Sequence, residues 1–245
     1  MLNAKVSTAP QIGFDRFIHF DWVAAALKVR TGMATLGDLD QLLSAAGLGT
    51  EARAKTRTKL NALALEPRTD LVEFIDRGAK LFADRRKSAE VAPFAWGAAL
   101  AVYPYFGKVA EFTGRLTSIQ GDCSVAEIHR RMSEVYGDRA VVKRATQAVL
   151  QTQASWGAIA RIEHGKRLVR LAPIGVRDQQ AVAWLVEAAL RYQGRAMPLA
   201  TLNSTTVLYP FLLDQSLAYA VANSDALELR SEGTSQQFVA LHATI

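Results

Sequence analysis

The side chains best suited to chemistry are long hydrogen-bond donors gathered between residues 122 and 171. This segment carries 9 basic and 5 acidic residues, whereas residues 172–245 carry 4 basic and 6 acidic residues. The segment therefore holds a net charge of +4 out of the +6 of the whole 245-residue chain, with residues 1–121 contributing +4 and residues 172–245 contributing −2. Lys and Arg donate hydrogen bonds to phosphate oxygens, and Gln can pair with an adenine edge, so this composition favours a polyanionic partner.

Two helices joined by a tight turn are predicted to position these donors. Ser124 and Glu127 form a Ser-x-x-Glu capping box that starts the first helix, and Gly137 is placed as its C-cap. Asp138 can cap the second helix, in which Val141, Val142 and later apolar residues are expected to form the buried stripe. The other faces of the second helix carry the donors that could enter a major groove: Arg139, Lys143, Arg144, Gln147 and Gln151.

A short hairpin is predicted to follow the second helix. Residues 158–162 and 166–171 have the roughly two-residue period of strands, and they flank the turn Glu163-His164-Gly165. Helix, turn, helix and hairpin together form the winged-helix version of the helix-turn-helix. The hairpin carries cations that could grip a phosphate backbone: Arg161, Lys166, Arg167 and Arg170. The alternative is a winged-helix module that binds protein and has a solvated basic face.

The rest of the chain also reads as mainly helical. Helices are expected over residues 21–30, 36–46, 50–65 and 69–82, followed by a loop at 84–87. In the third helix, Arg53 and Arg57 lie four residues apart on one ridge, which is either a second phosphate contact or a solvated face. After residue 178 the sequence predicts a repeat of this order, with helices at 178–192, 199–213 and 215–222 and a hairpin at 226–230 and 236–242. This acidic second copy favours protein contacts, including self-association.

The most apolar stretch, residues 91–106, is too short and too interrupted to cross a membrane. Pro93 and Pro104 break it, so it is interpreted as part of a buried core helix over residues 91–116. Cys123 is the only cysteine, which excludes an intrachain disulfide and favours a reducing, cytoplasmic location.

No residue pattern of an enzyme, metal site or cofactor site is found. Gly165-Lys166 is followed by Arg167 rather than by Ser or Thr, so the phosphate-loop pattern fails. The four histidines are scattered without metal-ligand spacing. Cys123 with His129 could form a thiol–imidazole pair, but a buried cysteine beside a surface histidine is the favoured reading. We therefore expect neither catalysis nor a bound metal or cofactor.

Part of the chain resembles the BrxA proteins of BREX phage-defence systems. The resemblance rests on the basic helix over residues 50–63, the following Leu71-Val-Glu-Phe-Ile, the element Tyr103-Pro104-Tyr105-Phe106 and the helix-turn-helix region, and it covers about half of the chain. The unit beginning at Asp178 departs from that family. The resemblance implies a non-enzymatic DNA-binding accessory component of a prokaryotic defence operon.

These observations predict a mainly α protein in three parts. Residues 1–88 form a helical bundle, residues 89–175 an apolar helix with a winged helix, and residues 176–245 a winged-helix-like unit. The predicted function is non-catalytic binding of double-stranded DNA, with other defence proteins and a second copy of the chain as further possible partners and no membrane partner. The alternatives are a protein-interaction scaffold and a dimeric transcriptional repressor.

Overall fold

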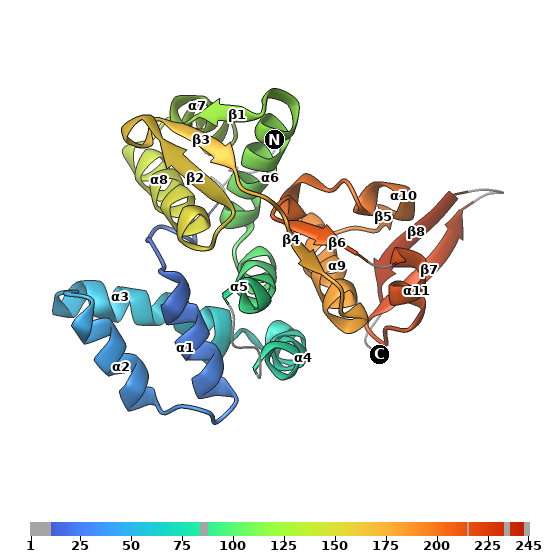
Figure 1. The fold of residues 1–245 in the computed structure, drawn as a ribbon, viewed down its shortest axis with the longest axis horizontal. Helices are drawn as coiled ribbons and strands as arrows, with labels where there is room; N and C mark the ends of the chain where they lie inside the picture. The colour runs from blue at the N-terminus through green and yellow to red at the C-terminus, as the bar shows by residue number, and fades with distance from the viewer. Residues whose placement is uncertain (1–10, 84–87, 215, 233–235, 243–245) are drawn as a thin grey trace, which may run out of the picture.

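The protein is mainly helical and is arranged around one central helix. The computed structural model describes residues 11–83, 88–214, 216–232 and 236–242. In Figure 1 the helix α5 (Ser88–Val102) lies at the centre, with the N-terminal helices, the α6–α8 region and the C-terminal region on three sides of it. Every residue from 91 to 103 is buried, so α5 presents apolar surface in all directions and each region packs part of its own core against it.

Four helices precede α5, as the sequence predicts. They are α1 (Phe20–Arg30), α2 (Leu36–Ala45), α3 (Thr50–Leu60) and α4 (Val72–Phe82). The predicted third helix continues from α3 as a π-helical turn over Asn61–Leu65, and a 3₁₀ turn, Thr69–Leu71, leads into α4. His19, rather than Asp21, caps α1, because its Nδ1 accepts a hydrogen bond from the Asp21 N–H. The predicted loop at residues 84–87 lies outside the described residues.

The single apolar helix predicted over residues 91–116 is wrong, because the structure has two helices there. Helix α5 ends at Val102 and α6 (Pro104–Gln120) begins two residues later. Tyr103 between them has an extended backbone with φ −127° and ψ 90°. Pro104 causes this break, since proline disfavours the helical conformation in the residue before it and is accommodated in the first turn of a new helix.

A three-stranded sheet and two helices follow α6. The elements are β1 (Asp122–Ser124), α7 (Val125–Tyr136), α8 (Ala140–Ser155), β2 (Ile159–Ile162) and β3 (Arg167–Arg170), with sheet order β1-β3-β2. Both predicted helices and the predicted hairpin are confirmed, and Ser124 caps α7 by accepting the Glu127 N–H. The predicted cap of α8 is wrong. Arg139 occupies that position, and Asp138 instead pairs with Lys143.

The C-terminal region repeats this order of elements. It contains α9 (Gln179–Gln193), β5 (Met197–Pro198), α10 (Leu199–Leu202), α11 (Leu217–Ala222), β7 (Leu227–Glu232) and β8 (Gln236–Leu241). Their sheet order, β5-β8-β7, matches β1-β3-β2 in the first unit strand for strand. Helix α9 agrees with the helix predicted over residues 178–192 to within one residue at each end, with Asp178 as its N-cap and the left-handed Gly194 as its C-cap. Topologically, the second unit is a copy of the first.

The helix predicted over residues 199–213 is wrong beyond its first turn. After α10 the chain forms a 3₁₀ turn, Thr206–Leu208, and then β6 (Phe211–Leu213), which pairs in parallel with β4 (Ile174–Val176). This segment lies directly on α6, where a Cβ atom added at Gly114 would come within 2.2 Å of the Thr206 carbonyl oxygen. Glycine at position 114 therefore permits the close approach that holds the segment out of a helix.

Trp184 of α9 joins the C-terminal region to the rest of the protein. Its ring stacks on Phe74 at 4.5 Å and lies near Phe94 at 5.9 Å, and its indole N–H donates to the Phe74 carbonyl oxygen at 2.8 Å. Gly78 of α4 and Gly97 of α5 face the same ring, which leaves no space for a side chain at either position. The three regions predicted as separate domains consequently share one continuous hydrophobic core.

Candidate nucleic-acid interface

The first half of α8 carries exposed positive charge. Arg139, Lys143 and Arg144 are all exposed, whereas from Ala145 onward the residues of α8 are buried or half-buried. Lys143 pairs with Asp138 at 3.2 Å, and Arg139 donates to the Tyr136 carbonyl oxygen at 2.9 Å. Among the described residues Arg144 has no hydrogen-bond or ion-pair partner. Arg144 is therefore the α8 cation most available to a ligand.

The two glutamines predicted as base readers lie on the same side of α8 as Arg144. Residues 144, 147 and 151 are separated by three and four positions, a spacing that places them along one face of a helix. Gln147 and Gln151 are half-buried, so they are less accessible than Arg144. A ligand bound along this face would therefore contact the exposed Arg144 more readily than the half-buried glutamines.

Hydrogen bonds to two other parts of the chain fix the position of α8. The Tyr105 hydroxyl of α6 contacts both the Val142 carbonyl oxygen, at 2.9 Å, and Thr146, at 2.8 Å. Burial raises the pKa of Tyr105 to about 12, so this hydroxyl stays protonated at neutral pH. Further along the helix, Thr152 accepts the Ile18 N–H at 3.0 Å. The exposed half of α8 is thus held rigidly by its buried half.

Two of the four hairpin cations, Arg167 and Arg170, are engaged within the protein. Arg167 pairs with Asp122 and lies 3.6 Å from Glu163, and this contact lowers the pKa of Asp122. Arg170 donates to the Tyr209 carbonyl oxygen and lies over the Tyr209 ring, which ties β3 to the C-terminal region. Arg161 is half-buried beside the hairpin turn at Gly165.

Lys166 differs from the other hairpin cations. Its side chain is exposed and has no partner among the described residues. Of the four predicted hairpin contacts, the structure leaves only Lys166 both exposed and unpaired. It extends the set of available cations from α8 to the neighbouring hairpin.

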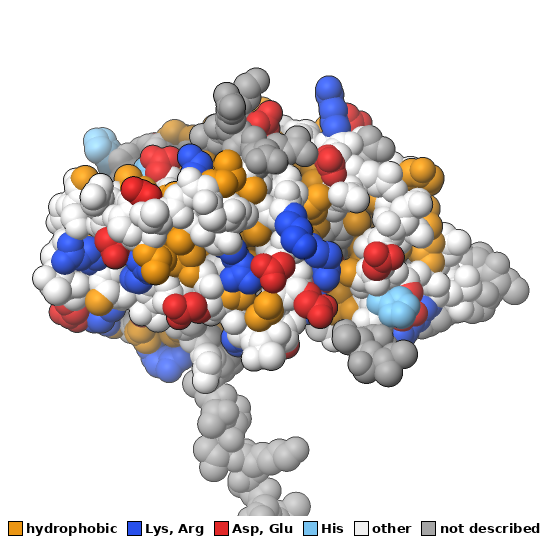
Figure 2. Space-filling view, turned by 90° about the horizontal axis from the view of Figure 1, so that it is seen from below, with side chains coloured by type: hydrophobic (Ala, Val, Ile, Leu, Met, Phe, Trp, Pro, Cys, Tyr) orange, Lys and Arg blue, Asp and Glu red, His pale blue; other side chains and the backbone are white. Residues whose placement is uncertain are grey.

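The N-terminal pair is also engaged internally. Arg57 pairs with Asp40 of α2 at 2.6 Å and donates to Asn61 at 3.0 Å, while Arg53 donates to Ser44 at 2.5 Å. These contacts hold α3 against α2. On the face seen from below in Figure 1, basic and acidic side chains are interspersed (Figure 2). Arg53 and Arg57 are thus engaged in contacts that stabilise the helical bundle.

Both members of the possible thiol–imidazole pair have shifted pKa values. Burial, with smaller contributions from Glu127 and Asp122, raises the pKa of Cys123 to about 12, so the thiol stays protonated. His129 is half-buried rather than on the surface, and its Nε2 is buried without a hydrogen-bond partner among the described residues. Burial and then the Lys143 charge lower the pKa of His129 below 6.5.

We expect His129 to make stability depend on pH. Because its folded-state pKa lies below 6.5, the unfolded chain binds more protons as the pH falls through this value, and the free energy of unfolding decreases. Urea unfolding measured above and well below pH 6.5 should show a smaller loss for His129→Gln than for the unchanged protein. Equal losses in both proteins would contradict this assignment.

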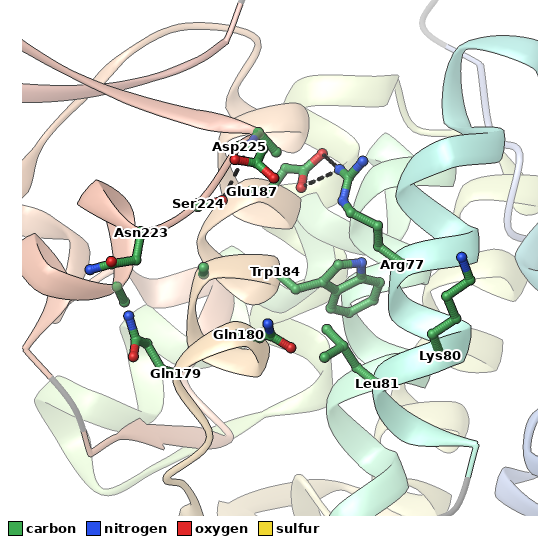
Figure 3. Close-up of a pocket in the computed structure, with 13 residues that line it drawn as sticks. Arg77, Lys80, Leu81, Gln179, Gln180, Trp184, Glu187, Asn223, Ser224 and Asp225 are labelled. Atoms are coloured by element: carbon green, nitrogen blue, oxygen red, sulfur yellow. Dashed lines mark hydrogen bonds and ion pairs between the residues drawn. The ribbon is translucent and has the colours of Figure 1, made fainter.

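A cavity of about 270 Å³ lies between α4, α9 and α11 (Figure 3). Its wall includes Glu187, only 2% exposed, whose two oxygens accept hydrogen bonds from Arg77 at 2.7 Å. Arg191 pairs with the same carboxylate at 2.9 Å. Sequence reasoning missed this cluster because its arginines come from two different helices. Because both arginines pair with Glu187, the cluster stabilises the contact between α4 and α9.

A second cavity of about 270 Å³ contains a serine, a histidine and an aspartate: Ser155, His19 and Asp21. His19 Nδ1 accepts the Asp21 N–H at 3.3 Å and lies 3.5 Å from the Asp21 carboxylate, whereas a catalytic triad requires Nδ1 to donate a hydrogen bond to the carboxylate. Ser155 likewise accepts the Phe20 N–H at 3.1 Å. These side chains cap α1 and attach it to α8.

The described residues contain neither a cluster of metal ligands nor a membrane-spanning helix. No three His, Cys, Asp or Glu side chains in the described ranges gather as metal ligands. None of the helices within those ranges has both the length and the apolar character that a membrane crossing requires.

No model of a protein family matches the sequence, and no curated protein or solved structure matches it. The resemblance to BrxA proteins accordingly rests on the quoted residues alone.

Proposed function

We propose that the protein binds double-stranded DNA through α8 and the β2–β3 hairpin, acting as a winged helix without catalysis. The observation that carries this proposal is the exposed first half of α8, with Arg144 unpaired within the described part of the chain. Recognition helices contact base edges through their N-terminal residues. Lys143 beside it and Lys166 on the hairpin supply further charge at the same unit.

The arrangement of elements supports the winged-helix assignment. Helix α6, strand β1, helices α7 and α8 and the β2–β3 hairpin follow the winged-helix order, and β3 lies between β1 and β2 in the sheet. We place the direct contacts at Arg144, Lys143 and Lys166. Arg167 and Arg170 contribute mainly by holding the hairpin through Asp122 and Tyr209, and Arg161 is half-buried.

A protein-interaction role is the second candidate, and exposed apolar residues on the same unit favour it. Val141 in the first turn of α8 is 37% exposed, and Ile162 at the end of β2 is 42% exposed. Such residues are typical of surfaces that bind protein, although a valine can also contact a thymine methyl group. In this alternative the unit would bind a protein partner and would be indifferent to DNA.

Salt-dependent binding to a DNA duplex tests the proposal. We expect affinity to fall steeply with salt, and Lys143→Ala combined with Arg144→Ala to weaken binding about tenfold or more and to reduce the log–log salt slope by about 2. Fluorescence anisotropy of a labelled duplex measures both quantities. The matched control, Lys28→Ala with Arg195→Ala, removes two exposed cations from other elements and should retain the slope.

The outcomes separate the two candidates. Absence of binding at low salt would exclude DNA recognition and favour the protein-interaction role. An equal loss in the control pair would assign binding to overall charge rather than to α8. In a phage-defence setting the same duplex binding would serve an accessory component, as the resemblance implies.

A further inference from the structure

The strand β7 forms a free edge of the C-terminal sheet. In the sheet order β5-β8-β7 it pairs with β8 and with no other strand in the described part of the chain, and Figure 1 shows it on the outside of the molecule. Leu229 in its middle is 37% exposed, and Arg230 beside it is exposed. A six-residue edge with a partly apolar side is a template for pairing with another strand.

The β7–β8 register fixes which backbone groups point outward. His242 N–H donates to the Ala226 carbonyl oxygen at 2.8 Å, so residues 226 and 242 form a hydrogen-bonded pair. Hydrogen-bonded pairs alternate along an antiparallel ladder, so residues 228 and 230 also bond toward β8. The N–H and C=O groups of Leu229 and Ser231 therefore point away from β8 and are available at the edge.

The side chains of β7 are complementary to a second copy of the same strand. We propose that the protein forms a two-fold symmetric dimer in which two β7 strands pair antiparallel, with Leu229 opposite the Leu229 of the second copy. In this register Glu228 lies opposite Arg230 in both directions. Within one chain these residues already interact, since Arg230 Nε donates to Glu228 at 2.7 Å. Across the dimer each residue gains an opposite charge on the neighbouring strand.

Charge also excludes the neighbouring registers. The outward-pointing N–H and C=O groups of one β7 strand must face those of the other strand. The two neighbouring registers that satisfy this rule place the two-fold axis at residue 228 or at residue 230. A centre at 228 places two glutamates opposite each other, and a centre at 230 does the same for two arginines. Like charges directly opposite are destabilising. The Leu229-centred pairing is the register in which hydrogen bonds, charges and the exposed leucines all match.

The outward face of the second unit fits a copy of the chain better than it fits DNA. Helix α11, the counterpart of α8, carries no Lys or Arg, and Tyr219 on it is 59% exposed. The second unit therefore lacks the cations that the first unit presents on α8. The β7 edge of the second unit is therefore free to pair with a second copy of the chain. The proposed dimer does not depend on whether the first unit binds DNA.

Charge reversal tests the dimer. Sedimentation of the full chain should show a mass twice the 26.7 kDa of one chain at high concentration. Glu228→Arg alone and Arg230→Glu alone should each be monomeric, because like charges then face each other across the symmetry axis. A mixture of these two variants should dimerise, and so should the double variant Glu228→Arg/Arg230→Glu, since both restore opposite charges.

A backbone variant provides an independent test. Leu229→Pro removes an N–H that points away from β8, so the β7–β8 ladder is retained while the edge hydrogen bonds are lost. We expect a folded monomer with an unchanged circular dichroism spectrum. A wild-type chain that stays monomeric at every concentration would overturn the proposal. Dimers that persist in the two single variants, or a mixture of these variants that stays monomeric, would overturn it as well.

Discussion

Replacing Gly97 with alanine is expected to destabilise the protein by about 3 kcal/mol, at the upper end of the usual cost of overpacking. A Cβ atom at this position would lie 2.2 Å from Trp184 Cζ3. Trp184 cannot move away, because Phe74 stacks on its ring and its N–H is bonded to a carbonyl oxygen. The helix preference of alanine over glycine, about 1 kcal/mol, is too small to offset the collision.

Chemical unfolding followed by tryptophan fluorescence measures this loss. Gly175→Ala is the matched control, since nothing lies within 4 Å of a Cβ atom there, and it should change stability by less than about 0.5 kcal/mol. Trp184→Leu in the Gly97→Ala background should recover part of the loss, because the smaller side chain relieves the collision. Simple additivity of the two substitutions would contradict the proposed contact.

The buried cluster around Glu187 gives the second large effect. Removing both arginines, by Arg77→Ala with Arg191→Ala, leaves a carboxylate that is 2% exposed without its cations. An uncompensated buried charge costs about 3–5 kcal/mol. Glu187→Leu alone should cost less, because the side chains of Arg77 and Arg191 are 42% and 24% exposed and reach water.

The triple variant decides whether the charge itself is responsible. Adding Glu187→Leu to the double arginine variant removes the orphaned carboxylate and should restore stability relative to that double variant. Urea unfolding of the four proteins completes the comparison. If the triple variant is less stable than the double arginine variant, the arginines act through packing instead.

Local signals account for the elements that the sequence predicts well. The Ser124 cap with Glu127, the Asp178 cap and the left-handed Gly194 each act within four residues, so they can be read without knowledge of the fold. Helix start and stop signals likewise predict the N-terminal helices close to their observed bounds. Such features depend on neighbouring residues alone.

Elements that depend on distant partners could not be predicted. Strands β4 and β6 have three residues each and exist because they pair with each other across more than thirty residues of chain. The same limit applies to the candidate site. Helical spacing identified the faces of α8, yet Arg57 and Arg170 are engaged by Asp40 and Tyr209, which are far away in sequence. Which cations remain free is decided by tertiary contacts.

The all-round burial of α5 has a consequence for synthesis on the ribosome. The helix emerges before α9, whose Trp184 covers Gly97, and about eighty residues must be added before this cover exists. During that interval an apolar helix faces solvent or a chaperone, because no earlier segment can replace α9. The last third of the chain thus completes the fold of the first third, and a nascent chain stopped before α9 would be prone to aggregate.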